Sequence, residues 1–414
     1  MPRRRVVITG LGPITPIGTG VEGLWDGLRA RRSAVRTITR FDPELWRSRC
    51  AGEVADFAPA DHLEAKRAKR LDRFGQFSVI AAKLALDDAG LDLAVEDRER
   101  IGAMMGTALG GVGFAETELT KFVQHGIRAV DPLLALAVFG GASSCNVAIE
   151  FGLHGPNSTN AMSCASGAIA IGEGFRQIRD GYADVMLAGG AEAPLMPLCF
   201  GAFALIRAMS TRNDDPGAAS RPFDRGRDGF VMAEGATVLV LEERSRALAR
   251  GARIYAELTG YGTTSDAHHM TAPRPDGRQA ARAMCLALAD AHVAPHEVGY
   301  VNAHGSSTPL NDPTETLAVH QVFGEHAPQL AVSGTKGYYG HALGASGAFE
   351  AAITALALAR EWLPPTVNLA EADAACDLAY LTGEGREEAV DVALSNSFGF
   401  GGINAALLFR RDDA

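Results

Sequence analysis

The chain has 414 residues, of which 47% are hydrophobic, so it can bury a large core and is long enough for two or three domains. Its formal net charge of -10 disfavours non-specific nucleic-acid binding, and any acidic partner would need a local basic patch. No apolar stretch reaches the ~18 residues that span a bilayer. The six cysteines have neither zinc nor C-x-x-C spacing, so no metal site is expected, and their pattern favours a reduced, cytoplasmic protein.

Strands and helices are predicted to alternate along the chain. The first apolar run, residues 6–10, follows three arginines but ends in glycine too early for a signal peptide, so we predict a strand there. In chain order, the further predictions are a helix over 77–89, a strand over 101–106, a helix over 168–179, strands over 185–189 and 237–242, a charged helix over 242–250, and helices over 280–291 and 345–359. This alternation predicts a layered α/β architecture.

The two halves of the chain share short segments in a common order. Residues 5–12 resemble 255–262, 100–106 resemble 297–303, Ala-Ser-Gly-Ala stands at both 165–168 and 345–348, and 184–188 resemble 391–395. The common order predicts a duplicated unit. We place the boundary after Gly251, which gives an N-terminal half of residues 1–251 and a C-terminal half of residues 252–414.

Cys164 lies in a turn of small residues directly before the helix predicted over 168–179. A thiol at a helix N-terminus feels the positive end of the helix dipole, which favours the thiolate. Backbone amides of the turn could hold an oxyanion, and small neighbours leave room for a thioester. The alternative is a buried cysteine under an ordinary helix cap, and this segment alone does not decide between them.

Two histidines lie in segments that invite catalytic interpretation. His304 follows a predicted strand, at the edge where α/β proteins usually place reactive groups, and three hydroxyl residues come after it. His341 precedes the second Ala-Ser-Gly-Ala segment, so the duplication places it near the counterpart of the Cys164 turn. Lys336 and Glu350 flank His341 and are either a buried ion pair or two solvated charges.

A glycine-rich segment, residues 396–404, lies near the end of the chain. It lacks the lysine and the spacing of phosphate-binding loops, so nucleotide binding is not expected. Its glycines instead predict a mobile or tightly turned loop that carries Phe400.

Together these four segments resemble β-ketoacyl-[acyl carrier protein] synthases, especially the synthase II group. The resemblance runs from residues 6–12 to 396–404 and includes 184–192, 209–213, 221–224 and 227–235. It implies the thiolase fold, with two duplicated halves in a five-layered α-β-α-β-α arrangement, and an obligate dimer. The implied reaction is a decarboxylative Claisen condensation of a cysteine-bound acyl chain with malonyl-acyl carrier protein, without metal or other cofactor.

The resemblance also implies roles for individual residues. Cys164 would carry the acyl chain, and a cysteine thioester splits the reaction into two steps. His304 and His341 would polarise the malonyl thioester carbonyl, which suits a reaction that needs donors for developing negative charge. The other implied roles are an oxyanion hole from the backbone N–H groups of Cys164 and Phe400, a gate from the Phe400 ring, site electrostatics from Lys336 anchored by Glu350, pantetheine contacts from Ser306 and Thr308, and an acyl pocket lined by Leu109 and Phe203.

A basic run at residues 66–73 stands out in this acidic chain. Such spacing alone is typical of a solvated helix face. The resemblance assigns Lys66, Lys69 and Arg70, together with Arg207, to docking of the acidic acyl carrier protein, which local positive charge would steer.

Several positions depart from the usual synthase II pattern. Ser306 stands where threonine is common, and Tyr338 and Tyr339 replace smaller or more flexible residues. Residues 135–142 lack the usual proline and Asn-Met pair of a stretch that normally lies at the dimer interface, near the far end of the acyl pocket. Acyl length and partner subunit therefore stay open.

The main interpretation is type II fatty-acid elongation by a homodimer. The alternative is the catalytic ketosynthase of a type II polyketide or polyene pathway, paired with a chain-length factor; the retained Cys164 argues against this chain being that inactive partner. A thiolase would need a second cysteine near the site, which the loop around Phe400 does not carry. A non-catalytic acyl-binding subunit would not need the cysteine and both histidines.

Overall fold

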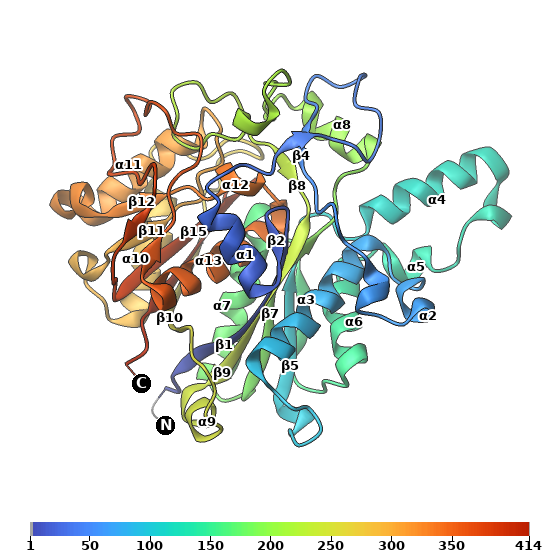
Figure 1. Cartoon of the computed structure of the whole chain (residues 1–414), viewed down its shortest axis with the longest axis horizontal. Helices are drawn as coiled ribbons and strands as arrows, with labels where there is room; N and C mark the ends of the chain where they lie inside the picture. Colours follow the sequence, from blue (N-terminus) through green and yellow to red (C-terminus); the bar gives the residue numbers. More distant parts are fainter. Residues whose placement is uncertain (1–2, 414) are drawn as a thin grey trace.

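A computed structural model describes residues 3–413, and Figure 1 shows its elements. The strands of the main sheet are β1 (Val6–Thr15), β5 (Ile101–Gly106), β6 (Asn157–Asn160), β7 (Val185–Glu192), β9 (Gly235–Glu243), β10 (Ala256–Ser265), β11 (Tyr300–Asn302), β12 (Ala331–Ser333), β15 (Val392–Gly399) and β16 (Ile403–Arg410). Short strands are β2 (Gly18–Thr19), β3 (Arg36–Thr37), β4 (Cys50–Gly52), β8 (Met232–Ala233), β13 (Trp362–Leu363) and β14 (Arg386–Glu387).

The α-helices stand between these strands. They are α1 (Gly20–Arg29), α2 (Ala65–Ala68), α3 (Arg73–Ala89), α4 (Val112–His125), α5 (Leu134–Ala137), α6 (Ala142–Phe151), α7 (Ser166–Arg179), α8 (Pro197–Leu205), α9 (Arg244–Ala249), α10 (Arg278–Ala291), α11 (Asn311–Phe323), α12 (Lys336–Tyr339) and α13 (Ser346–Arg360). Among the described residues, no helix is both long and apolar enough to cross a membrane.

The main sheet repeats one topology on either side of its centre. Its order is β12-β11-β15-β16-β10-β1-β9-β7-β5-β6, and the two halves meet where β1 and β10 pair antiparallel. Counted along the chain, the second strand of each half (β5 or β11) runs parallel to the third (β6 or β12) and to the fourth (β7 or β15). The fourth strand pairs antiparallel with the fifth (β9 or β16). Three of the repeated segments therefore occupy matching strands, and the Ala-Ser-Gly-Ala segments occupy the starts of the matching helices α7 and α13, which accounts for their common order.

Helices α7 and α13 pack against each other at the centre of the molecule and contact strands of both halves (Figure 1). Helix α3 covers the outer face of the N-terminal half of the sheet, and α10 covers that of the C-terminal half. This is the five-layered α-β-α-β-α arrangement that the resemblance implied. The exact boundary after Gly251 stays a prediction.

Glycines explain why the outer helices lie so close to the central strands. A Cβ atom at Gly10 or Gly12 of β1 would come within 2.2 or 1.9 Å of a carbonyl oxygen of α3. The repeated glycines of β10, Gly260 and Gly262, would meet carbonyl oxygens of α10 at 2.2 and 2.1 Å. Because only hydrogen fits at these positions, the Thr-Gly-X-Gly repeat sets the helix–sheet spacing in both halves.

The charged helix predicted over 242–250 is shorter than expected, because Glu242 belongs to strand β9. Its fully buried carboxylate accepts a hydrogen bond from Thr9 on the neighbouring strand and pairs with Arg246 and Arg250. These partners allow the charged Glu242 to stay inside a buried strand, although the sequence around it resembles the start of a helix.

Candidate active site

Cys164 lies in a tight turn, η4 (Ser163–Ala165), that leads into helix α7. Ser163 has φ of 51°, a conformation that costs energy for a residue with a side chain. The matching turn of the C-terminal half, η8 (Leu343–Ala345), leads into α13 and has φ of 42° at Leu343. The duplication thus extends to backbone strain, and the strained turn presents Cys164 beyond the helix end.

The two turns are held side by side by the repeated Ala-Ser-Gly-Ala segments. A Cβ at Gly167 would come within 2.9 Å of the Gly344 carbonyl oxygen, and a Cβ at Gly347 within 2.8 Å of the Ala168 nitrogen. The N-termini of α7 and α13 therefore touch backbone to backbone. This contact brings the turn with Cys164 next to the segment with His341.

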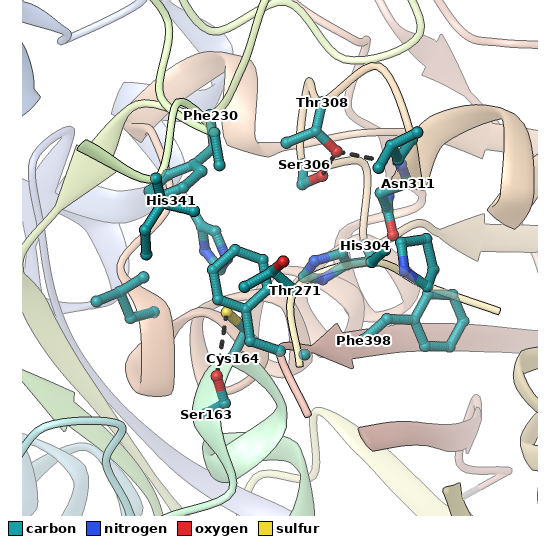
Figure 2. A pocket seen from close by; sticks show the side chains of 18 of the residues that line it. Ser163, Cys164, Phe230, Thr271, His304, Ser306, Thr308, Asn311, His341 and Phe398 are labelled. Atoms are coloured by element: carbon teal, nitrogen blue, oxygen red, sulfur yellow. Dashed lines mark hydrogen bonds between the residues drawn. The ribbon is translucent and has the colours of Figure 1, made fainter. Parts of the chain in front are cut away.

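A cavity of about 370 Å³ opens at this junction, a size typical of small-molecule sites. Cys164, His304, His341 and Phe400 all line it, so the structure gathers these four predicted residues at one place. Figure 2 shows the first three of them around the cavity. Among the residues described, no cluster of three or more His, Cys, Asp or Glu side chains could hold a metal ion.

His304 and His341 face each other in the cavity and are both 3% exposed. Their ring centroids lie 5.4 Å apart with the planes nearly perpendicular. Burial lowers the pKa of each imidazole well below its usual value, and the positive charge of Lys336 lowers both pKa values further. Both rings are therefore neutral at neutral pH, and each carries a single N–H.

Lys336 and Glu350 form a fully buried ion pair behind the histidines. Burial raises the pKa of Glu350 to about 7, and the neighbouring ammonium opposes that rise. The Lys336 ammonium also donates to the His304 carbonyl oxygen at 2.6 Å and to His304 Nδ1 at 3.4 Å. Because an ammonium has no lone pair, His304 Nδ1 must accept, and the ring proton is on Nε2.

The expected thiolate at Cys164 is wrong for the resting site. The side chain is buried, and desolvation raises the pKa of its thiol to about 11. A hydrogen bond from Ser163, the charge of Lys336 and the Phe400 backbone N–H all act in the opposite direction but do not prevail. The resting cavity is thus lined by a protonated thiol and two neutral imidazoles.

The loop that carries Phe400 lies over the cysteine turn. Gly399 is so close that a Cβ there would come within 3.1 Å of the Cys164 nitrogen. Beyond it, Gly401 and Gly402 have φ of 86° and 73°, and Gly401 N–H donates to the Met270 carbonyl oxygen at 2.7 Å. The tight turn predicted for this segment is therefore present.

Aromatic and hydroxyl side chains form the rest of the cavity wall. The Phe400 ring stacks on Phe203 with centroids 6.5 Å apart, and Leu109 also lines the cavity. Ser306 and Thr308 line it as well and share a hydrogen bond of 2.9 Å. All five residues thus line the same cavity as Cys164, and their acyl and pantetheine roles stay predictions.

The predicted docking residues lie outside the reacting centre. Arg207 is exposed and lines the cavity. Lys66, Lys69 and Arg70 are exposed at α2, which Figure 1 shows well apart from α8, the helix that precedes Arg207. The other two arginines of the basic run are engaged elsewhere, since Arg67 pairs with Glu150 and Arg73 with Glu234.

Sequence reasoning missed three polar groups that contact the site. Ser163 donates to the Cys164 sulfur at 3.9 Å, and the Ser346 hydroxyl is 2.8 Å from His341 Nδ1. The buried carboxylate of Glu315 accepts from the backbone N–H groups of His304 and Gly305, both at 2.8 Å. Ser346 lies inside the Ala-Ser-Gly-Ala repeat, so the repeat itself was a signal for it.

Two family models match most of the chain in succession. The model described as "Beta-ketoacyl synthase, N-terminal domain" matches residues 3–247, and "Beta-ketoacyl synthase, C-terminal domain" matches residues 255–370. The 3-oxoacyl-[acyl-carrier-protein] synthase 2 of Synechocystis sp. is 48% identical over 411 residues, which cover 99% of each chain. The protein of the same name from Coxiella burnetii is 44% identical over 411 residues, again 99% of each chain.

Solved structures share the fold over the same length. A β-ketoacyl synthase from Burkholderia phymatum has a TM-score of 0.92 at 39% identity, covering 99% of this chain and 100% of that chain. The ishigamide ketosynthase/chain length factor has a TM-score of 0.92 at 38% identity with the same coverage. A type II polyketide ketosynthase, bound to a hexaketide and in complex with its acyl-carrier protein, has a TM-score of 0.92 at 35% identity, also with that coverage.

Proposed function

Because the chain belongs to the β-ketoacyl synthase family of condensing acyltransferases, we propose that it extends acyl chains on acyl carrier protein in type II fatty-acid elongation. The observation that carries this proposal is the convergence of Cys164, His304 and His341 in one cavity. The full-length similarity to proteins named 3-oxoacyl-[acyl-carrier-protein] synthase 2 supports the choice of pathway.

In the first step, the Cys164 sulfur attacks the thioester carbonyl of the acyl-carrier protein. The oxygen becomes an oxyanion that the backbone N–H groups of Cys164 and Phe400 would hold, both beside the sulfur. The C–S bond to pantetheine then breaks, and the proton lost by Cys164 is balanced by the one gained by the pantetheine thiol. This exchange needs no permanent thiolate, which fits a thiol whose pKa is about 11.

In the second step, malonyl-acyl carrier protein loses its carboxylate as CO2, and the electron pair moves onto the thioester carbonyl as an enolate. A neutral imidazole N–H from each histidine would stabilise the developing negative charge. The enolate carbon attacks the acyl carbonyl on Cys164 and forms the new C–C bond. The Cys164 sulfur leaves, and a proton from solvent restores the thiol.

An apolar surface projects from the body of the protein. Exposed side chains gather on α4 and on the segment that includes α5, and Figure 1 shows α4 extending away from the sheet. They are Leu119, Phe122, Val123, Leu136, Val138 and Phe139. Strand β6 also ends the main sheet with an open edge. We propose that a second copy of the chain covers these surfaces, since a stable monomer rarely exposes so much apolar area.

The polyketide alternative rests on the solved neighbours, which include a ketosynthase/chain length factor. In that case, a homologous subunit would replace the second copy. Purified alone, the chain should form a homodimer and extend an acyl group; a chain that is inactive until a partner is added would favour the alternative.

The six free cysteines suit a reducing compartment, so we place the enzyme in the cytoplasm.

Intact-mass spectrometry tests the nucleophile directly. After incubation with acyl-loaded carrier protein, the chain should gain the mass of one acyl group, and Cys164→Ala should gain none. Peptide mapping should place the group on Cys164. If acyl groups of widely different lengths all leave the wild-type mass unchanged, or if Cys164→Ala is acylated equally, the proposed function is wrong.

A further inference from the structure

Ser346 is the first residue of α13 and lies beneath His341. Its hydroxyl oxygen is 2.8 Å from His341 Nδ1, with the Ser346 residue fully buried and His341 3% exposed. Figure 2 shows the His341 ring pointing into the cavity, so the other ring nitrogen, Nε2, faces the reaction space. Whichever way this hydrogen bond runs, it decides whether Nε2 is a donor or an acceptor.

The surroundings of the hydroxyl favour donation to the ring. Within residues 3–413, the Ser346 hydroxyl has no hydrogen-bond partner other than His341. If the hydroxyl accepted a proton from Nδ1, its own proton would be left without an acceptor in the protein interior. Such an orphaned donor costs more than the hydrogen bond contributes. Donation instead gives the proton a partner and leaves His341 with its single N–H at Nε2.

The duplicated serine shows that this contact is particular to the C-terminal half. Ser166 occupies the matching first position of α7 and donates to two backbone carbonyl oxygens, those of Thr107 at 2.8 Å and Ser163 at 2.7 Å. Ser166 therefore ties down the cysteine turn, whereas Ser346 directs its proton at a side chain of the cavity.

On this basis we propose that Ser346 is a positioning residue, which holds neutral His341 in the tautomer with its proton on Nε2. Lys336 does the same for His304, because its ammonium can only donate to Nδ1. The cavity then presents two imidazole N–H donors, both fixed from behind by a buried donor. This inference rests on the proposed function for its consequence, a matched pair of donors for the enolate, but the tautomer itself is a property of the resting protein.

The tautomer can be measured without any reaction. In wild-type protein labelled with ¹⁵N-histidine, we expect His341 to show a protonated Nε2 and an unprotonated Nδ1 at neutral pH, with His341→Ala used only to assign the signals. A protonated Nδ1 would overturn the proposal, even if the enzyme were fully active. A correct tautomer in a protein that fails to form an acyl adduct would instead count against the proposed function alone.

Kinetics of Ser346 variants test the consequence. In Ser346→Ala, the His341 signals should show both tautomers, and CO2 release from malonyl-acyl carrier protein on pre-acylated enzyme should slow by about five- to ten-fold, the value of one hydrogen bond. Acylation of Cys164 should change by less than about two-fold, and Ser346→Thr should recover the wild-type tautomer and rate.

Ser78→Ala is the matched control, since it also removes a buried serine hydroxyl from a helix, far from the cavity, where Ser78 donates to the Phe74 carbonyl oxygen. It should leave both steps unchanged. Either of two results for Ser346→Ala would overturn the proposal: an unchanged rate of CO2 release, or an equal loss of acylation and CO2 release.

Discussion

The two helix turns at the centre of the molecule share one backbone but differ in what covers their amide groups. Gly344 occupies the position in η8 that Cys164 occupies in η4, and each turn packs against the end of a strand from the other half. At the end of β7, the Glu192 carboxylate accepts from the Gly344 N–H at 2.9 Å. At the matching end of β15 stands Gly399, which has no side chain to cover the Cys164 amide.

This difference explains how a duplicated unit became an asymmetric site. In the C-terminal turn, a carboxylate of the protein occupies the amide and joins the turn to the loop after β5 through Ala108 N–H and Leu109 N–H. In the N-terminal turn, Gly399 puts no side chain over the Cys164 amide, which the proposed mechanism uses to hold the oxyanion of the substrate. On the proposed mechanism, one turn is structural and the other catalytic, and the two turns differ in a single position at the end of the strand that each packs against.

Gly399→Ala should have the largest effect on this comparison. The added Cβ would lie 3.1 Å from the Cys164 nitrogen and would intrude on the proposed oxyanion site. We expect acylation to slow by about 10²- to 10³-fold, the typical loss for one oxyanion donor, with the melting temperature little changed. The measurement is the single-turnover rate of acyl-adduct formation. Gly217→Ala, in open space, is the control, and a Gly399→Ala rate equal to wild type would show that the amide is not used.

The ionisation of Cys164 gives the next largest effect. Burial raises the pKa of the thiol to about 11, and the thiolate is the species that reacts with alkylating reagents. Below that pKa, each pH unit raises the thiolate fraction ten-fold, so alkylation of the resting enzyme should become about 100-fold faster from pH 7 to pH 9. A rate that levels off near pH 7 would mean that the helix dipole, rather than burial, sets the pKa.

Glu192→Gln should affect stability more than catalysis. The carboxylate accepts hydrogen bonds from the Gly344, Ala108 and Leu109 amides and from the Thr107 hydroxyl, whereas an amide side chain would turn a donor toward some of them. We expect the free energy of unfolding to fall by about 1–3 kcal/mol in denaturant titrations. Acylation should change far less than in Gly399→Ala; an equal loss would erase the distinction between the two turns.

Carrier-protein docking should show the smallest effect, because it concerns only the approach to the catalytic turn. Lys69 and Arg70 are exposed, and within residues 3–413 neither forms a salt bridge. Reversing both charges to Glu should slow association with carrier protein about ten-fold at low salt and weaken its salt dependence. The control reverses Arg278 and Arg282, exposed residues on α10. Equal salt-dependent association rates for wild type and the Lys69/Arg70 variant would remove these residues from the docking surface.

Much of the site could be predicted from the sequence, because the internal repeat indicates which segments lie at matching positions of the two halves. The two Ala-Ser-Gly-Ala segments placed His341 beside the Cys164 turn, and the structure brings both into one cavity. The strands over 101–106 and 185–189 were predicted from a different signal, because each is a short apolar run. The second of them, β7, extends further than predicted, to Glu192.

What the sequence did not predict depends on packing between distant segments. The Glu192–Gly344 contact joins residues 152 positions apart, and no local sequence pattern predicts it. The protonated state of Cys164 follows from its burial, which depends on the Phe400 loop and on both halves of the chain. The partner of the Ser346 hydroxyl likewise depends on where the His341 ring lies.

The division of labour between the halves is tested most directly by following one acyl group through both steps in His304→Ala. Pre-formed adduct on Cys164 is mixed with malonyl-acyl carrier protein, and intact mass reports its loss with time. We predict that His304→Ala still forms the adduct but discharges it at least about 100-fold more slowly than wild type, because a donor to the enolate is gone. Equal losses of adduct formation and discharge would contradict the assignment of the histidines to condensation.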